Sequence, residues 1–188
     1  MKKHFCTMKT NAHITGGKWP KLDEALKHFC NRELGSFAHD AMYDVKACRD
    51  IFFAMKHEQP FTEEDVFLFY DTETTGFPKK NGGIIQAGQA RVCQLAVLLT
   101  DYQGKSLAEF SGLIKPDGWI IDAGAGKVHG FTNELCEKHG MNFRAVVSLF
   151  NFMVERCTLM IAHNSDFDKQ MMEIELAYAS QPKQEIAA

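Results

Sequence analysis

The sequence lacks the long apolar runs that membrane insertion requires. No stretch of the 188 residues approaches the roughly 18 consecutive apolar side chains of a membrane-spanning helix. Residues 1–6 are basic but are not followed by the long apolar run of a signal peptide. We therefore expect a cytoplasmic protein without membrane contact.

An excess of positive charge is also missing. The chain has 21 Lys and Arg residues against 24 Asp and Glu residues, for a net charge of −3. Proteins that coat nucleic acid by charge alone are strongly basic. If this chain handles a polyanion, it must bind it locally, through metal ions and a few contacts.

Paired cysteine spacings are absent as well. No two cysteines form a Cys-x-x-Cys pair, and none has the Cys/His spacing of a zinc site. With 45% hydrophobic residues, the chain has the length and composition of one domain, 1–188, with a substantial core. We expect reduced, mostly buried thiols at Cys6, Cys30, Cys48, Cys93, Cys136 and Cys157.

What the sequence does contain is an apolar run that leads into two carboxylates. Residues 66–70 (VFLFY) are typical of a strand buried on both faces. Side chains alternate along a strand, so Asp71 and Glu73 point to the same side. Burying two unpaired negative charges is unfavourable unless a partner compensates, and a hard divalent cation is the natural one. The alternative is a solvated strand end in a turn.

Hydrophobic periodicity predicts helices and strands around this run. The turn at 101–105 should join two of the strands into an antiparallel meander with the 66–70 strand. Asp40 is placed to cap one helix, Thr132 another, and Asn164 or Ser165 a third. Strands are expected at 4–9, 66–70, 91–100, 107–114 and 158–162, and helices at 21–31, from 41 onward, after 132, at 143–156 and from 165 through 178.

Residues 122–127 (DAGAGK) are rich in glycine but do not form a phosphate-binding loop. A Walker-type loop needs glycine where Ile121 stands, and Ser or Thr where Val128 stands. We therefore exclude that reading.

Further acids and a histidine occur at two predicted helix starts. Asp168 lies in the first turn of the last helix, and His39 and Asp44 flank the start of another. If these ends converge with Asp71 and Glu73, the group suits two-metal hydrolysis of a phosphodiester, with histidine as the base. Each piece alone has a structural alternative, such as a first-turn acid favoured by the helix dipole.

Four segments closely resemble motifs of the DEDDh, or DnaQ-like, 3′→5′ exonucleases. This family includes the proofreading subunit of bacterial replicative polymerase and ribonuclease T. The resemblance covers nearly the whole chain. The segments are 69–76 (FYDTETTG), 128–132 (VHGFT), 162–168 (AHNSDFD) and 39–45 (HDAMYDV).

The resemblance implies both a fold and a reaction. The implied fold is α/β and ribonuclease H-like, a mixed five-stranded sheet flanked by helices. The implied reaction releases nucleoside 5′-monophosphates from single-stranded 3′ ends of DNA or RNA, with two divalent cations, Mg²⁺ or Mn²⁺. The implied site residues are Asp71, Glu73, Asp168 and Asp44 for the metal ions, His39 for the base, and Thr72, Thr74, His129 and Phe167 for the terminal nucleotide.

The motif order departs from that of the family. The motif with His39 and Asp44 comes last in the family and first here, so the chain resembles a circular permutant. On this interpretation, 1–54 matches the family's C-terminal third, 55–65 is a linker, and 66–188 matches the rest. The linker spans up to about 36 Å when extended, so the site can close within one molecule, the arrangement we favour. A homodimer that swaps 1–54 is the alternative.

A second function is compatible with the same motifs. The chain could be a catalytically inactive nucleic-acid-binding or scaffold module that keeps the fold. The presence of all five catalytic residues favours the enzyme, because decay usually removes a carboxylate first. The sequence does not decide between DNA and RNA, since that depends on how the pocket treats the 2′-OH.

Overall fold

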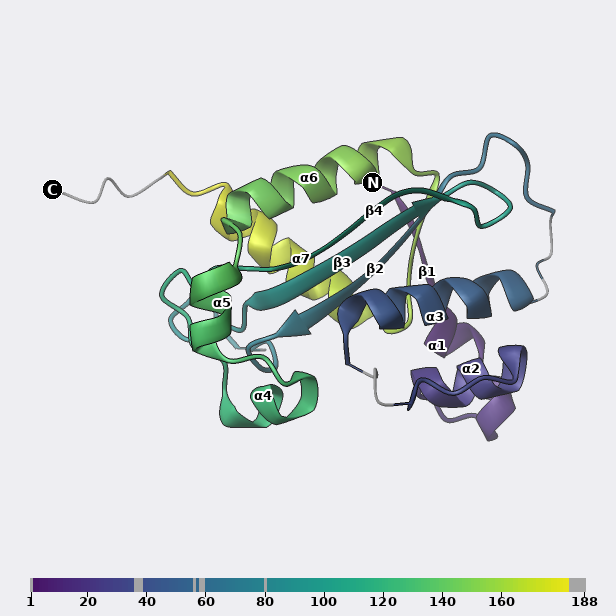
Figure 1. Ribbon diagram of the computed structural model, residues 1–188, viewed down its shortest axis with the longest axis horizontal. Coiled ribbons are helices and arrows are strands. Elements are labelled where there is room, and N and C mark those ends of the chain that lie inside the picture. Colours follow the sequence, from purple (N-terminus) through teal and green to yellow (C-terminus); the bar gives the residue numbers. More distant parts are fainter. Residues whose placement is uncertain (1, 36–38, 56, 58–59, 80, 183–188) are drawn as a thin grey trace, which may run out of the picture.

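A mixed β-sheet runs through the protein, with helices on both of its faces (Figure 1). This computed structural model describes residues 2–35, 39–55, 57, 60–79 and 81–182. The elements in chain order are β1 (Lys3–Cys6), α1 (Thr7–Thr10), the 3-10 helix η1 (Ala12–Thr15), α2 (Leu22–Cys30), α3 (Ala41–Ala54), β2 (Phe67–Thr74), β3 (Val92–Thr100), β4 (Ser106–Leu113), α4 (Ala123–His129), α5 (Asn133–His139), α6 (Phe143–Arg156), β5 (Leu159–Ala162) and α7 (Ser165–Ala179).

The five strands lie in the order β1-β5-β2-β3-β4. β5 runs parallel to both of its neighbours, β1 and β2, whereas β3 runs antiparallel to β2 and β4. β2, β3 and β4 are thus the predicted meander, and the α/β class with a mixed five-stranded sheet is confirmed. This arrangement puts β2 in the centre of the sheet.

The side chains of β2 alternate between two cores. Phe67 and Phe69 pack in a cluster with α3, while Leu68 and Tyr70 pack in a cluster with α6 and α7. The strand is therefore buried on both faces, as predicted. By the same alternation, the acidic positions further along β2 face the α3 side.

Two strand ends differ from the prediction by more than one residue. β2 continues to Thr74, so its two acids lie within the strand and not beyond its end. β1 ends at Cys6, and α1 replaces the rest of the predicted 4–9 strand. The reason is contact with a segment distant in sequence. The Met8 backbone N–H donates to the His163 carbonyl (3.0 Å) and the Thr7 hydroxyl donates to the His163 ring, which ties this segment to the loop after β5.

Helix α4 occupies the glycine-rich segment and was not predicted. Two glycines lower its helix propensity, which hides it from periodicity. It forms because Asp122 caps its start, the carboxylate accepting from the Ala125 N–H at 2.7 Å. Asp40 and Thr132 cap α3 and α5 as predicted. At α7 no side-chain cap is made, so that part of the prediction was wrong.

The predicted linker packs against the core where it is described. Residues 56 and 58–59 lie outside the described part of the chain. Phe61, however, stacks on Phe52 of α3 with ring centroids 5.4 Å apart, and lies 4.7 Å from the ring of Phe67 on β2. The end of α3 and the start of β2 are therefore joined by aromatic contacts within one chain.

The cysteines and the lengths of the helices also bear on the sequence analysis. All six cysteines are free and four of them are buried, as expected. Among the described residues, no helix has the length and apolar character needed to cross a bilayer.

A buried ion pair joins α7 to the start of β3. The Arg91 guanidinium donates to both carboxylate oxygens of Glu175, at 2.8 and 2.9 Å, and stacks over the Tyr178 ring at 4.0 Å. The Val92 N–H donates to the same carboxylate at 2.9 Å. This contact holds α7 against the sheet, and α7 carries the motif acid Asp168.

We expect Glu175→Gln to lower the free energy of unfolding by about 3–5 kcal/mol, because it leaves the Arg91 charge buried without its partner. Urea denaturation measures the change. Glu173→Gln is the matched control, since Glu173 is exposed on the same helix and should change stability little. Equal losses in the two variants would contradict the assignment.

Candidate active site

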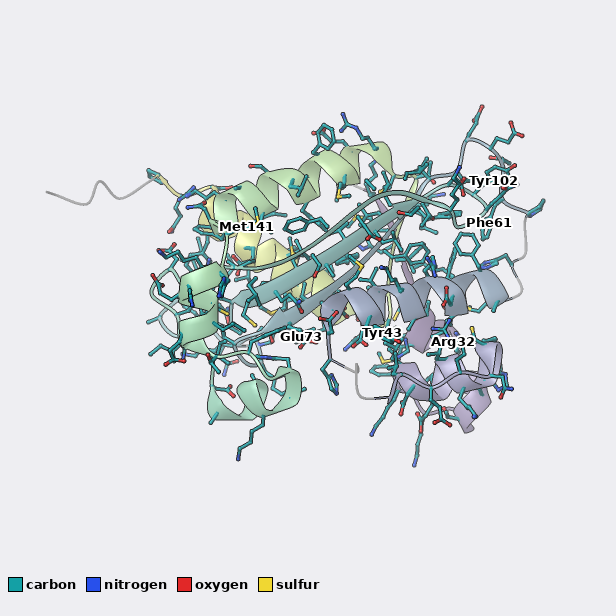
Figure 2. The ribbon with its side chains drawn as sticks, in the orientation of Figure 1. Arg32, Tyr43, Phe61, Glu73, Tyr102 and Met141 are labelled. Carbon is teal, nitrogen blue, oxygen red and sulfur yellow. The ribbon has the colours of Figure 1, made fainter. Side chains whose placement is uncertain are left out.

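Two carboxylates of the site project from β2 toward α3. Asp71 is half-buried and Glu73 is 9% exposed. Figure 2 shows Glu73 beside the start of α3. Because they are two residues apart on a strand, both acids share the face that α3 covers.

The start of α3 is fixed against the sheet next to these acids. The Ala41 N–H donates to the side-chain oxygen of Gln94 at 3.1 Å, and Gln94 lies opposite Glu73 on β3. His39, two residues earlier, has φ of 67°, a left-handed conformation that is uncommon for a non-glycine residue. Gln94 was missed by the sequence reasoning, because a single glutamine in a strand carries no motif signal.

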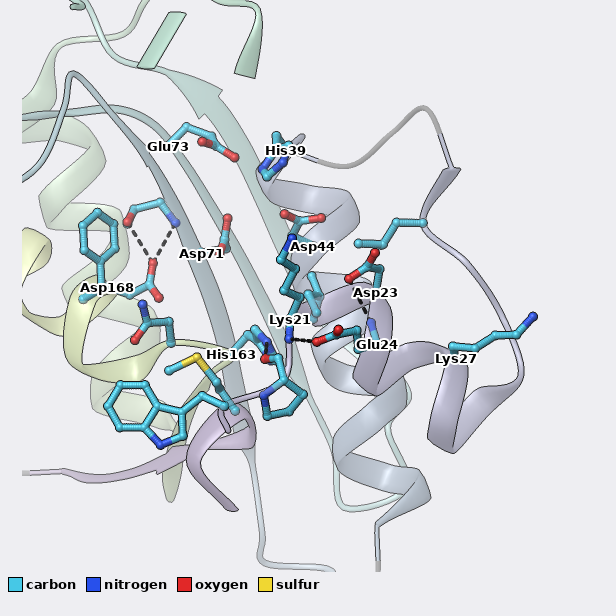
Figure 3. Close-up of a pocket in the computed structure, with 18 of the residues that line it drawn as sticks. Lys21, Asp23, Glu24, Lys27, His39, Asp44, Asp71, Glu73, His163 and Asp168 are labelled. Carbon is cyan, nitrogen blue, oxygen red and sulfur yellow. Dashed lines mark hydrogen bonds between the residues drawn. The ribbon is translucent and has the colours of Figure 1, made fainter. Parts of the chain in front are cut away.

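The N-terminal segment contributes a histidine and an acid to the same place as β2. One ligand atom each of His39, Asp44 and Glu73 lies within 4.8 Å of the others. In Figure 3 these three side chains and Asp71 surround one space. Residues more than 25 positions apart in sequence are therefore brought together within one chain.

Asp168 approaches from the other side of β2. It is 2% exposed, and one of its carboxylate oxygens accepts from the Thr72 N–H at 3.1 Å and the Thr72 hydroxyl at 2.8 Å. Thr72 faces away from Asp71 and Glu73 by strand alternation, so it can hold the α7 acid while its neighbours face α3. All four carboxylates line one cavity of about 1110 Å³.

The four residues proposed to contact a terminal nucleotide divide into two groups. Thr72 and Phe167 line the cavity, whereas Thr74 and His129 are not among the described residues that line it. His129 is held by two backbone contacts: its Nε2–H donates to the Thr74 carbonyl at 3.3 Å and its Nδ1 accepts from the Phe131 N–H at 3.0 Å. A substrate contact by Thr74 or His129 stays a prediction.

Burial raises the pKa values of the site carboxylates, and nearby acids add to the rise. Burial, followed by repulsion from neighbouring acids, raises the pKa of Glu73 to about 8. Burial also raises the pKa of Asp44 to about 7, and a hydrogen bond from the His39 backbone opposes the rise. Burial and its acidic neighbours hold the pKa of Asp71 well above the usual range. A bound cation would therefore stabilise the ionised form of these carboxylates.

The donor set fits a hard divalent cation. One oxygen of Asp44 is buried and has no hydrogen-bond partner among the described residues. Carboxylate oxygens are the ligands that Mg²⁺ and Mn²⁺ prefer. Asp71, Glu73, Asp168 and Asp44 would hold such ions, with His39 at their edge.

The sequence was compared with protein families and with known proteins. No family model matches the chain. Over 115 residues it is 30% identical to the DNA polymerase III subunit epsilon of Treponema pallidum (strain Nichols), a match that covers 61% of this chain and 48% of that protein. Over the matched residues, the chain is thus similar in sequence to part of this epsilon subunit.

Solved structures show that the chain shares the fold of part of exonuclease I over 61% of its length. The E. coli enzyme in complex with a 5cy-dA13 oligonucleotide matches with a TM-score of 0.52 and 21% identity, over 61% of this chain and 24% of that one. A zinc-bound form of its complex with single-stranded DNA matches with a TM-score of 0.53 at the same identity and coverage. The chain thus spans about half of the epsilon subunit and a quarter of exonuclease I.

The raised pKa values predict an unusual pH dependence of stability. An acid whose pKa is raised on folding stabilises the protein below its unfolded pKa, near 4, and this contribution is lost as the pH rises through its folded pKa. In EDTA, we expect the melting temperature of the protein to fall between about pH 5 and pH 9. Mg²⁺ should raise the melting temperature more at the upper end, because the ligands are ionised there.

Thermal unfolding of Glu73→Gln and of Glu137→Gln tests the source of this effect. Glu73→Gln should flatten the pH dependence in EDTA, whereas Glu137→Gln, an exposed acid outside the cavity, should leave it unchanged. A wild-type melting temperature that rises from pH 5 to pH 9 in EDTA would refute the prediction.

Proposed function

We propose that the chain is a metal-dependent 3′→5′ exonuclease that hydrolyses phosphodiester bonds at single-stranded 3′ ends. The observation that carries the proposal is the meeting of His39 and Asp44 with the acids of β2 and α7 in one cavity. The likeness to the epsilon subunit and to exonuclease I supports it. The oligonucleotides in the exonuclease I complexes are DNA, so single-stranded DNA is the first substrate to test, with RNA beside it.

Four carboxylates would hold the two divalent cations, Mg²⁺ or Mn²⁺, in this proposal. When bound, the cations neutralise the phosphate oxygens, acidify the attacking water and stabilise the leaving 3′ oxygen. The chain itself supplies the alignment. Thr72 orients Asp168 through two hydrogen bonds, and Gln94 fixes the helix start next to Glu73.

His39 would be the general base. Its side chain is exposed at the edge of the acidic group. Its left-handed backbone and the capped start of α3, which follows it, define the backbone from which that side chain extends. His39 takes one proton from water as the water oxygen bonds to phosphorus. The bond from phosphorus to the 3′ oxygen breaks, and the leaving 3′ oxygen takes up a proton from solvent while the His39 imidazolium returns its proton to solvent. The products are a nucleoside 5′-monophosphate and a strand one nucleotide shorter with a 3′ hydroxyl.

We also propose that the chain is a circular permutant of the family order. β1 lies beside β5 and parallel to it, and α7 follows β5 in sequence. A strand that followed α7 would take this position in an ordinary parallel crossover. Joining residue 188 to residue 1 would therefore make β5, α7 and β1 one continuous unit. The contacts of α3 with β2 and β3 support closure of the site within one molecule.

Hydrolysis of a 3′-labelled oligonucleotide tests the proposed activity. We expect Mg²⁺-dependent release of mononucleotides that EDTA abolishes. His39→Ala should lower kcat by about 100- to 10,000-fold, the usual contribution of a general base. His28→Ala is the control, because His28 is exposed and outside the cavity. Binding of DNA and RNA without any hydrolysis would favour the inactive module.

A mixing experiment tests closure within one molecule. We expect co-refolded His39→Ala and Asp71→Asn chains to remain as inactive as each variant alone, because neither molecule has both side chains. In a swapped dimer, random pairing would restore about a quarter of the sites, since 1–54 of one copy would complete 66–188 of the other. Activity measured together with mass from light scattering decides between the two.

A further inference from the structure

The cavity has a second wall that the catalytic proposal does not use. This wall includes Trp19, Pro20, Lys21 and Lys27, from the loop before α2 and from α2 itself, together with the α2 acids Asp23 and Glu24. Its volume of about 1110 Å³ exceeds the range typical of single small-ligand sites, about 300–1,000 Å³. The cavity therefore has room for more than the terminal nucleotide.

Trp19 presents a large aromatic surface in this wall. It is 61% exposed, whereas the other tryptophan, Trp119, is 8% exposed. The Lys9 ammonium lies 5.6 Å from the Trp19 ring centroid and pairs with Asp166, just before the motif acid of α7. An exposed indole ring that lines a cavity is suited to stacking on a nucleobase.

Lys21 is a cation directed toward the acids. Figure 3 shows its side chain extended in the cavity, and it forms no ion pair within the described residues. Lys27, the other lysine of this wall, pairs with Glu33 at 3.0 Å. The nearby Glu24 carboxylate instead accepts from the Lys21 backbone N–H at 2.7 Å, as part of the start of α2. The Lys21 ammonium thus remains available for a phosphate.

This wall is anchored to the catalytic side by a half-buried histidine. His163 Nε2–H donates to the Pro20 carbonyl at 3.0 Å, and its Nδ1 accepts from the Thr7 hydroxyl at 2.9 Å. Burial lowers the pKa of His163 to about 4, so the ring is neutral and keeps this pattern at physiological pH. Pro20 is therefore held in place between the two residues that face the cavity.

We propose that Trp19 and Lys21 form a second substrate subsite, for the nucleotide on the 5′ side of the scissile phosphate. The Trp19 ring stacks on the base of that nucleotide. The Lys21 ammonium contacts a backbone phosphate. This inference rests on the proposed exonuclease function. It predicts that the enzyme prefers oligonucleotides to esters of a single nucleotide.

Steady-state kinetics on two substrates tests the subsite. The p-nitrophenyl ester of thymidine 5′-monophosphate has the terminal nucleotide but no upstream one, whereas dT10 has both. Trp19→Ala should raise KM for dT10 about 5- to 100-fold and leave the ester unchanged, and Trp19→Phe should restore most of the affinity. Equal effects on both substrates, or none on dT10, would overturn the proposal.

Binding measurements separate this inference from the exonuclease proposal. In an Asp71→Asn background, dT10 should quench tryptophan fluorescence, and Trp19→Phe should remove the quenching. Lys21→Ala should reduce the slope of log Kd against log salt by about 0.7, and Lys18→Ala, an exposed control outside the cavity, should not. Quenching without wild-type hydrolysis of either substrate would refute the exonuclease but keep the subsite. Quenching that survives in Trp19→Phe would refute the subsite.

Discussion

Mutual repulsion among four carboxylates is the constraint around which this protein is arranged. Asp71, Glu73, Asp168 and Asp44 line one cavity, and burial together with their proximity raises their pKa values. Because like charges repel, these carboxylates do not hold one another in place. The surrounding packing has to hold it, and the apolar side chains of β2 provide that support on both faces of the strand.

The period of two along β2 explains how the acids are shared between elements. Alternate residues face α3 or α7, so one strand presents two carboxylates to the first helix and a hydroxyl to the acid of the second. The buried pair of Arg91 and Glu175 then fixes α7 on β3. A shift of one residue in the register of β2 would exchange these roles and dismantle the site.

The N-terminal 54 residues have more than one task in the proposed enzyme. They supply the base and the fourth carboxylate, and also the wall with Trp19 and Lys21. His163 ties that wall to the end of β5, where the helix with Asp168 begins. In the proposed enzyme, substrate recognition and chemistry therefore depend on the same docking of this segment onto the sheet.

The sequence by itself determined the central strand, the helix over Phe143–Arg156 and the caps at Asp40 and Thr132, because local periodicity and capping residues encode them. The resemblance to the exonuclease motifs indicated which acids to look for. It did not determine α4, whose start depends on a single cap among glycines, or the end of β1, which depends on bonds to His163. Only the tertiary structure decided that His39 and Asp44 meet Glu73 within one chain, and that a loop near Trp19 faces the same cavity. Those contacts join residues far apart in sequence, and no local pattern records which distant side chains will face each other.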